Sequence, residues 1–291
     1  MQAAMDRVRA LKCWSGPVAP EIVKGGITNA NFRVEDKGRR YFVRVGDDIP
    51  VHGVMRFNEL SASRAAAACG LSPAIIHAEP GAIVFDFIEG KTLGAEDVRQ
   101  PAMLKRILPL VRTCHREMPL HVRGPALIFW VFHVLRDYAH SLREGKSRYL
   151  SGLPHLMDTS AVLEKAVGEI EIVYGHNDLL PTNFIDAGTR LWLIDWDYAG
   201  FNSPLFDLAN LASNNEVAEA DELALLEAYF VRKVDAGLLR RYHAMKCASL
   251  LRETMWSMIS EIHSTLDFDY GAYTAENMAR FERALEHFRS I

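Results

Sequence analysis

The chain has 291 residues, 49% of them apolar, which is enough for a sizeable core in one or two compact units. Its 33 basic residues are outnumbered by 37 acidic ones, and the net charge of −4 gives no general attraction for nucleic acid or for an anionic membrane. A polyanionic macromolecular partner is therefore disfavoured, whereas a small cationic substrate suits this balance.

Neither export nor a disulfide framework is indicated. Charged side chains interrupt the apolar residues of segment 1–13, unlike a signal peptide, and the longest apolar stretch, 125–135, is too short to cross a bilayer. We therefore expect a cytoplasmic protein with reduced thiols. The cysteines are far apart and form no CxxC pair: Cys13, Cys69, Cys114 and Cys247.

The first part of the chain has the pattern of a β-sheet. From Glu21, short β-prone runs flank a Gly-Gly pair, and a polar turn at 35–38 precedes a further strand at 41–45. The alanine-rich segment 55–70 ends on a glycine, as a helix with a glycine C-cap does. Two more short strands are expected at 74–77 and 82–87.

The second part is mainly helical. Leu104, Ile107, Leu108 and Val111 share one face of a helix, and a similar spacing recurs near Leu223. Segment 172–212 interrupts this pattern with short Val/Ile/Trp runs, which predict strands inserted among helices. The change near 86–90 from a strand pattern to a helical pattern is the expected boundary of an α+β protein with two units, 1–88 and 89–291.

The residues with the clearest chemistry lie in this inserted segment. Stretch 173–185 reads VYGHNDLLPTNFI, and an apolar run further on ends at Asp195. Phosphoryl transfer requires a carboxylate beside the attacking hydroxyl and oxygen ligands that hold Mg²⁺ against the phosphates. Asp178, Asn183 and Asp195 supply such a set, although the first two also suit a simple turn cap.

This spacing resembles the HxDxxxxN catalytic loop and the following Mg-binding Asp of the aminoglycoside phosphotransferase and choline kinase group, relatives of the protein kinases. The resemblance implies a bilobal kinase-like fold, with a β-rich N-terminal lobe containing one main helix and a mainly helical C-terminal lobe. It implies ATP as donor, Asp178 as the base or hydroxyl-orienting group, and Asn183 and Asp195 as Mg²⁺ ligands.

The N-terminal part agrees with a nucleotide site. Segment 24–29, KGGITN, resembles a loop that covers phosphates, because glycine lets the backbone approach and Thr or Asn can donate. Arg44 stands where protein kinases carry lysine, and Glu59 is its natural partner, although both also suit surface charges. The implied nucleotide-binding residues are Gly26, Thr28, Asn29, Arg44, Glu59, Asp86 and Ile88, the last two through their backbone.

The resemblance is most specific to choline and ethanolamine kinases, through HNDL at 176–179 and IDWDY at 194–198. It implies bracing roles for His176 and Asp207. Aromatic faces hold a quaternary ammonium by cation–π attraction, and the implied acceptor-binding residues are Asp178, Tyr198, Trp256 and Tyr270.

The sequence departs from that family at three positions. Glu253 replaces an aromatic residue of the pocket, Asn214 an acidic residue, and Leu180 the usual glutamine. A pocket with fewer aromatic walls favours ethanolamine or another amino alcohol over choline, because an ammonium with N–H groups can hydrogen-bond. Trp256 equally suits a buried core position. Contacts of Asp197, Asn214 and Glu253 with substrate are left open, as is the oligomeric state.

Two other functions remain as alternatives. One is a kinase for another hydroxylated metabolite, such as an aminoglycoside, a sugar or thiamine. The other is a nucleotide-binding pseudokinase without turnover, which the presence of Asp178, Asn183 and Asp195 disfavours.

Overall fold

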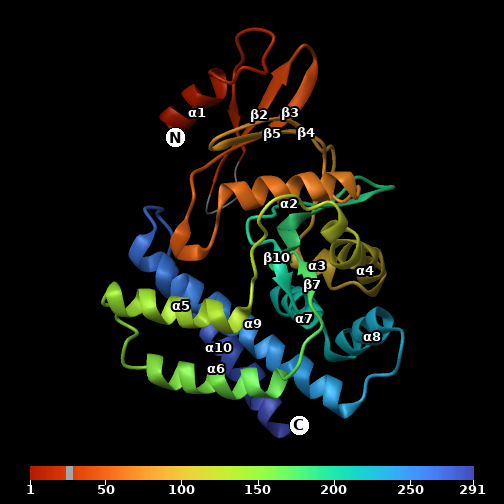
Figure 1. Ribbon diagram of the computed structural model, residues 1–291, viewed down its shortest axis with the longest axis vertical. Coiled ribbons are helices and arrows are strands. Elements are labelled where there is room, and N and C mark those ends of the chain that lie inside the picture. Colours follow the sequence, from red (N-terminus) through yellow and green to blue (C-terminus); the bar gives the residue numbers. More distant parts are fainter. Residues whose placement is uncertain (24–28) are drawn as a thin grey trace.

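The computed structural model describes residues 1–23 and 29–291. Predicted nucleotide-binding residues Gly26 and Thr28 lie outside these ranges. A sheet formed by the N-terminal part stands above a larger helical part, and helix α2 (Arg56–Ala68) runs between them (Figure 1). The predicted α+β class, with a β-rich N-terminal part followed by a mainly helical one, is confirmed.

The main sheet has five antiparallel strands in the order β1-β2-β3-β5-β4. The turn between β2 and β3 places Lys37 and Gly38 at positive φ, of 50° and 73°, as a tight hairpin with right-handed strand twist requires. The strand predicted at 41–45 is present and begins two residues earlier. The strand bounds are β1 Glu21–Ile22, β2 Ala30–Asp36, β3 Arg39–Val45, β4 Ile75–Glu79 and β5 Ala82–Asp86.

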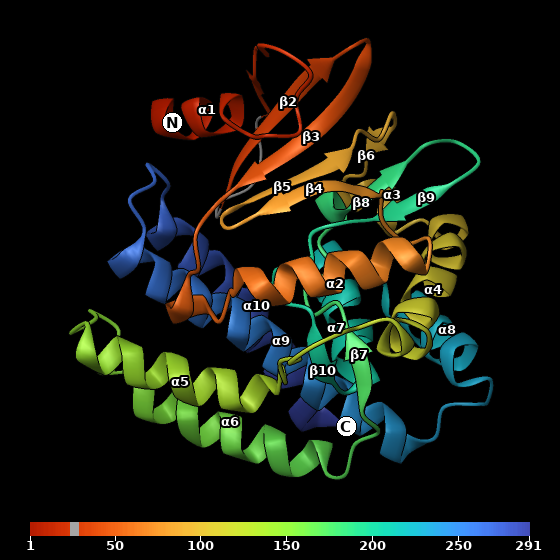
Figure 2. The same cartoon turned by 45° about the horizontal axis from the view of Figure 1, so that its top comes forward.

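One face of this sheet is covered by helix α1 (Gln2–Arg9), which the sequence analysis did not predict (Figure 2). Val8 of α1 is fully buried and packs in one apolar cluster with strand residues such as Phe32, Val43 and Val84. The indole Nε1 of Trp14 donates to the Val8 carbonyl at 2.7 Å and fixes the end of the helix. The sheet therefore has a small core of its own.

Helix α2 belongs by its packing to the larger core. Its buried residues Ala62, Ala65 and Ala66 cluster with apolar residues of the helical part rather than with those under the sheet. Alanine side chains are small enough to let the helix lie close against its neighbours. The division at residue 88 stays a prediction, because α2 precedes it in sequence yet shares the core that follows it.

The helical part is built around α9 (Ala236–His263), which packs against α5, α6, α7 and α10. Most of the middle of α9 is buried, from Tyr242 to Ser260. The helical patterns predicted around Leu104 and Leu223 are confirmed by α4 and α8. No helix of the described residues is long and apolar enough to span a membrane. The other bounds are α3 Ala95–Val98, α4 Pro101–Arg116, α5 Val131–Glu144, α6 Leu153–Val167, α7 Pro204–Asn215, α8 Glu219–Phe230 and α10 Tyr270–Ser290.

Short strands do interrupt the helices in segment 172–212, as predicted. Strand β7 (Val173–Gly175) pairs with β10 (Gly200–Asn202). Strand β8 (Phe184–Asp186) pairs with both β9 (Leu191–Leu193) and β6 (Lys91–Thr92). The loop between β7 and β8 and the loop after β9 are thus held at adjacent strand ends, which is how Asp178, Asn183 and Asp195 come together.

The chain leaves the main sheet through Gly90, which lies against β8. A Cβ added there would lie 2.7 Å from Ile185 Cγ2 and 2.8 Å from the backbone oxygen of Asp186.

We expect Gly90→Ala to cost about 1 to 3 kcal/mol of stability, because the backbone must shift to relieve the overlap. Thermal unfolding measures this, with Gly16→Ala as control, since a Cβ at Gly16 meets nothing within 4 Å. Equal melting temperatures for the two variants would contradict the close contact between Gly90 and β8.

Candidate active site

A cleft of about 700 Å³ lies between the main sheet and the helical part. Its walls come from β3, the segment after β5, the loops around β8 and β9, and the middle of α9. Eight of the sequence-predicted site residues line it: Arg44, Asp86, Ile88, Asp178, Asn183, Asp195, Tyr198 and Trp256.

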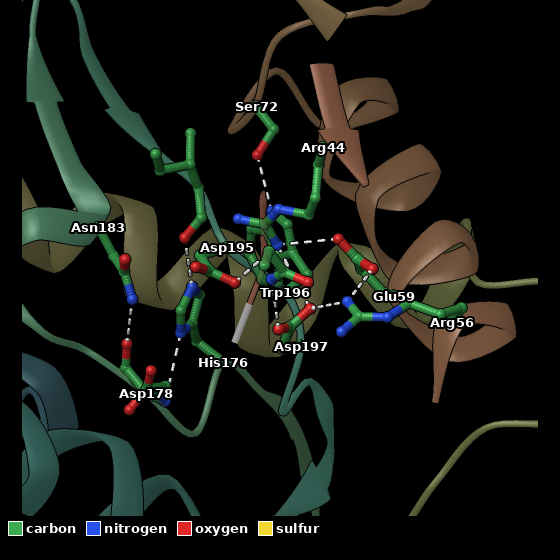
Figure 3. A network of polar contacts seen from close by, with 12 residues as sticks. Arg44, Arg56, Glu59, Ser72, His176, Asp178, Asn183, Asp195, Trp196 and Asp197 are labelled. Atoms are coloured by element: carbon green, nitrogen blue, oxygen red, sulfur yellow. Dashed lines mark hydrogen bonds and ion pairs between the residues drawn. The ribbon is translucent and has the colours of Figure 1, made fainter. Parts of the chain in front are cut away.

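The loop that carries Asp178 is fixed by hydrogen bonds at both ends (Figure 3). The Asp178 amide donates to His176 Nδ1 at 3.3 Å, and His176 Nε2 lies 2.9 Å from the Ile194 carbonyl. Asn183 donates its Nδ2–H to the Asp178 carbonyl at 2.8 Å. The loop and the strand leading to Asp195 therefore form one connected unit.

Asp207, near the start of α7, holds the backbone of the same loop. Its carboxylate accepts from the amides of His176 and Asn177, at 2.8 and 2.7 Å, and is 2.9 Å from His115 Nε2. Burial opposes the charge of Asp207, but the bond with His115 keeps the pKa of this carboxyl below its usual value. These are the contacts that the predicted bracing roles of His176 and Asp207 require.

Asn177 is a second support, which the sequence analysis did not identify. It has a φ of 65°, a left-handed conformation that asparagine tolerates better than most residues. Its Nδ2 lies within 3.0 to 3.3 Å of the carbonyl oxygens of Gly175, Tyr198 and Gly200. One fully buried amide thus connects the catalytic loop to the chain segment after Asp195. Its only signal in the sequence was its place inside the motif.

Asp195 also has a left-handed backbone, with φ of 71°. A non-glycine residue in this region stores strain that the surrounding structure must hold, and such residues concentrate at functional sites. The Asp195 carboxylate accepts from Arg44 Nη1 at 2.9 Å, and its side chain remains 26% exposed toward the cleft. The carboxylate is therefore anchored on one side and open on the other.

Arg44 lies at the centre of a buried charge network (Figure 3). The predicted pair with Glu59 is present, with Arg44 Nη1 2.8 Å from Glu59 Oε1, and Glu59 is only 1% exposed. Arg56, one turn before Glu59, donates to Glu59 at 2.6 Å and to Asp197 at 3.0 Å. The network joins β3, α2 and the loop after β9, and it includes Asp197, whose role the sequence left open.

The carboxylates of the cleft differ in their electrostatic environment. Burial raises the pKa of Asp178 to about 8; Glu253, Asp195 and Asp197 add to this, while Arg252 opposes it. Burial opposes the charge of Asp195 too, yet Arg44 keeps its pKa below the usual value. Asp178 is thus the group suited to take up a proton, and Asp195 the one suited to remain anionic.

The donor set fits a hard divalent cation. Asn183 and Asp195 both line the cleft and offer amide and carboxylate oxygens, the ligand types that Mg²⁺ prefers. Asn183 directly precedes β8, and Asp195 follows β9, which pairs with β8. The Ile194 amide donates to the Asn183 carbonyl at 3.0 Å.

Asp86, Ile88 and Asn29 are the remaining predicted nucleotide-binding residues in the described part of the chain. Ile88 lines the cleft, and the Asp86 carboxylate pairs with Arg39 while the Asp86 amide donates to the Ala74 carbonyl at 2.9 Å. Asn29 donates to Asp197 at 3.1 Å, so it contacts the charge network.

The opposite end of the cleft contains a buried cation that the sequence analysis missed. Arg252 of α9 is 2% exposed, and its guanidinium lies 4.4 Å from the ring centroid of Tyr198. Its Nη1 is 2.9 Å from Glu253 and 3.8 Å from Asp178. The only signal was an arginine within the apolar run of a helix.

The aromatic residues predicted to bind the acceptor do not all line the cleft. Trp256 reaches the cleft but is 6% exposed, stacks near His52 at 5.2 Å and donates Nε1–H to the Tyr198 hydroxyl at 3.0 Å. Tyr270 lies behind Trp256, where its hydroxyl donates to Ser264 at 2.8 Å, and it does not line the cleft. Tyr273 lines the cleft instead and donates to Glu253 at 2.8 Å.

This geometry, on an α+β fold with a sheet above a helical part, defines a kinase-like phosphotransferase. The family follows from the sequence: residues 21–224 match the family described as choline/ethanolamine kinase. The chain belongs to that family, and it is a phosphotransferase that uses ATP and has an alcohol group as acceptor.

Individual relatives agree. The chain is 24% identical to the protein LicA of Haemophilus influenzae, over 90% of this chain and 78% of LicA. It is 26% identical to ethanolamine kinase 2 of Rattus norvegicus, over 94% and 78% of the two chains. The crystal structure of a choline/ethanolamine kinase family protein from Mesorhizobium loti matches with a TM-score of 0.80 and 27% identity, over 98% and 94% of the chains.

The charge network yields a stability prediction. Replacing Arg44 by Met leaves the carboxylates of Glu59, Asp195 and Asp197, two of them buried, with fewer cations, and we expect a loss of about 3 to 5 kcal/mol, or a fall in melting temperature of about 6 °C or more. The matched control is Arg136→Met, whose own side chain is 49% exposed and whose partner Glu164 is 32% exposed, so about 0 to 1 kcal/mol is at stake. Similar shifts in the two variants would disprove the central place of Arg44.

Proposed function

We propose that the enzyme phosphorylates a primary amino alcohol of the ethanolamine type, with Mg²⁺-bound ATP as donor. Its relatives include proteins named ethanolamine kinase, and the family name covers both choline and ethanolamine. The observation that carries the choice between them is the guanidinium of Arg252 over the ring of Tyr198.

The transfer step uses the groups around Asp178. Asp178 accepts the proton of the substrate hydroxyl as its oxygen forms a bond to the γ-phosphorus, and the bond from that phosphorus to the bridging oxygen of ADP breaks. Asn183 and Asp195 would hold Mg²⁺, which would supply positive charge beside the phosphate oxygens. Arg44, oriented by Glu59, adds positive charge beside the phosphates.

A quaternary ammonium has no N–H group and depends on aromatic faces. In this cleft the face of Tyr198 is already in contact with a cation, and Trp256 has little exposed surface. Arg252 would repel any ammonium placed there, and choline has no N–H group with which a hydrogen bond could offset that repulsion. Choline is therefore the poorer acceptor.

An ammonium with N–H groups finds partners at the same end of the cleft. Glu253 lines it and supplies carboxylate oxygens, and the Tyr273 hydroxyl orients Glu253. Charge-assisted hydrogen bonds are each worth about 1.5 to 3 kcal/mol, compared with about 0.5 to 2 kcal/mol for a cation–π contact.

Asp178→Asn tests the transfer step. The variant keeps the shape of the side chain but cannot accept the proton, so we expect kcat to fall by at least about a hundredfold with ATP affinity nearly unchanged. ADP release measures turnover, titration calorimetry measures ATP binding, and Asp158→Asn on the exposed face of α6 is the control. Near-normal turnover would remove Asp178 from the mechanism; no turnover in the parent protein with any alcohol would favour a pseudokinase.

Substrate choice is tested by comparing ethanolamine with choline. We expect kcat/KM to be at least about tenfold higher for ethanolamine, the ratio that about 1.4 kcal/mol of extra hydrogen bonding produces. Glu253→Gln should raise the KM for ethanolamine by about tenfold or more and change the KM for ATP little. Glu261→Gln, on the same helix but at the surface, is the control. A preference for choline in the parent would disprove the proposed substrate without touching the assignment of Asp178.

A further inference from the structure

A group of metal-ligating side chains lies away from the cleft, where three helices meet. Glu219 is the first residue of α8, His243 lies in α9, and His287 lies in the last turns of α10. Each offers one ligand atom, and the three atoms lie within 4.8 Å of one another. All three side chains line one cavity of about 290 Å³.

His243 is the best-positioned member of the group. It is 4% exposed, and its Nε2 is buried without a hydrogen-bond partner among the described residues. A buried polar atom is normally satisfied, so an unpartnered ring nitrogen points to a missing ligand. The rings of His243 and His287 are 4.6 Å apart, and His287 Nε2 is 3.8 Å from Glu219 Oε1.

The charges around the group permit a cation. Lys246, which lines the same cavity, is paired with Glu222, which also accepts from the Tyr242 hydroxyl. Arg280 is engaged with Asn277 and with the Ser213 carbonyl. Burial, together with His287 and Lys246, lowers the pKa of His243 to about 4, so its imidazole is neutral and can act as a ligand near pH 7.

We propose that Glu219, His243 and His287 form a binding site for a divalent transition metal such as Zn²⁺. Two imidazole nitrogens and one carboxylate are a ligand set that suits Zn²⁺, with water in the fourth position. Mg²⁺ prefers oxygen ligands in an octahedral arrangement and does not suit this set. Because the ligands come from α8, α9 and α10, the bound ion links the start of one helix to the end of another and stabilises the folded chain.

The test uses the full-length protein, first treated with chelator and then held in excess Mg²⁺ to occupy the oxygen ligands of the cleft. Co²⁺ is the spectroscopic probe, because a tetrahedral nitrogen and oxygen site gives visible absorption. Zn²⁺ is the probe in thermal unfolding, where we expect a rise of about 5 to 10 °C when free Zn²⁺ is about a hundredfold above its Kd.

His287→Gln and Glu219→Gln are the informative variants, because both positions are solvated and neither substitution threatens the core. We expect each to abolish the Co²⁺ absorption and most of the Zn²⁺-dependent shift, while His155→Gln, an exposed histidine of α6, retains both. Asp195→Ala should also retain both. Binding that persists in His287→Gln, or that disappears in Asp195→Ala, overturns the proposal.

Discussion

The cleft depends on one network of three carboxylates and two guanidinium groups that are mostly removed from water. Removing a charge from water is costly unless an opposite charge accompanies it, so none of the three chain segments that supply these groups is stable at this position without the others. Arg44 comes from the sheet, Arg56 and Glu59 from α2, and Asp195 and Asp197 from the loop after β9. The network therefore sets how the sheet stands over the helical part at the level of the cleft.

The catalytic loop is held by a second set of contacts, all of them to backbone. Asp207 and Asn177 bind amides and carbonyls of the loop and of the segment after Asp195. Two residues in this region, Asn177 and Asp195, have left-handed conformations, in which a non-glycine residue is strained. Supports of this kind fix the carboxylates of Asp178 and Asp195 relative to each other before any substrate binds.

The sequence predicted the parts of the site that are encoded locally. Asp178, Asn183 and Asp195 stand at fixed spacing on adjacent loops, and Arg44 follows from its place on a recognisable strand. Arg252 escaped prediction because its partners, Tyr198 and Asp178, are distant in sequence, and its place among apolar residues of a helix does not by itself identify a buried cation. Tyr273 and Tyr270 lie within one helical turn of each other, and only tertiary packing decides which ring reaches the cleft. Helix α1 gave no motif at all, since its burial depends on a sheet formed later in the chain.

The two ends of the cleft are built from different parts of the chain. In the proposed mechanism, phosphoryl transfer uses Asp178, Asn183 and Asp195, whose supports lie in the loops around β7 to β9 and in α7. Recognition of the acceptor is proposed to use side chains of α9 and α10, in particular Glu253 and Tyr273. Arg252 shows the consequence: a guanidinium fixed by its neighbour Glu253 lies on the aromatic face that a quaternary ammonium would need, while the carboxylate that accepts N–H groups remains. In the proposed scheme a residue of α9 thus changes which amines are recognised, and its distance of 3.8 Å from Asp178 couples that choice to the group proposed as the base.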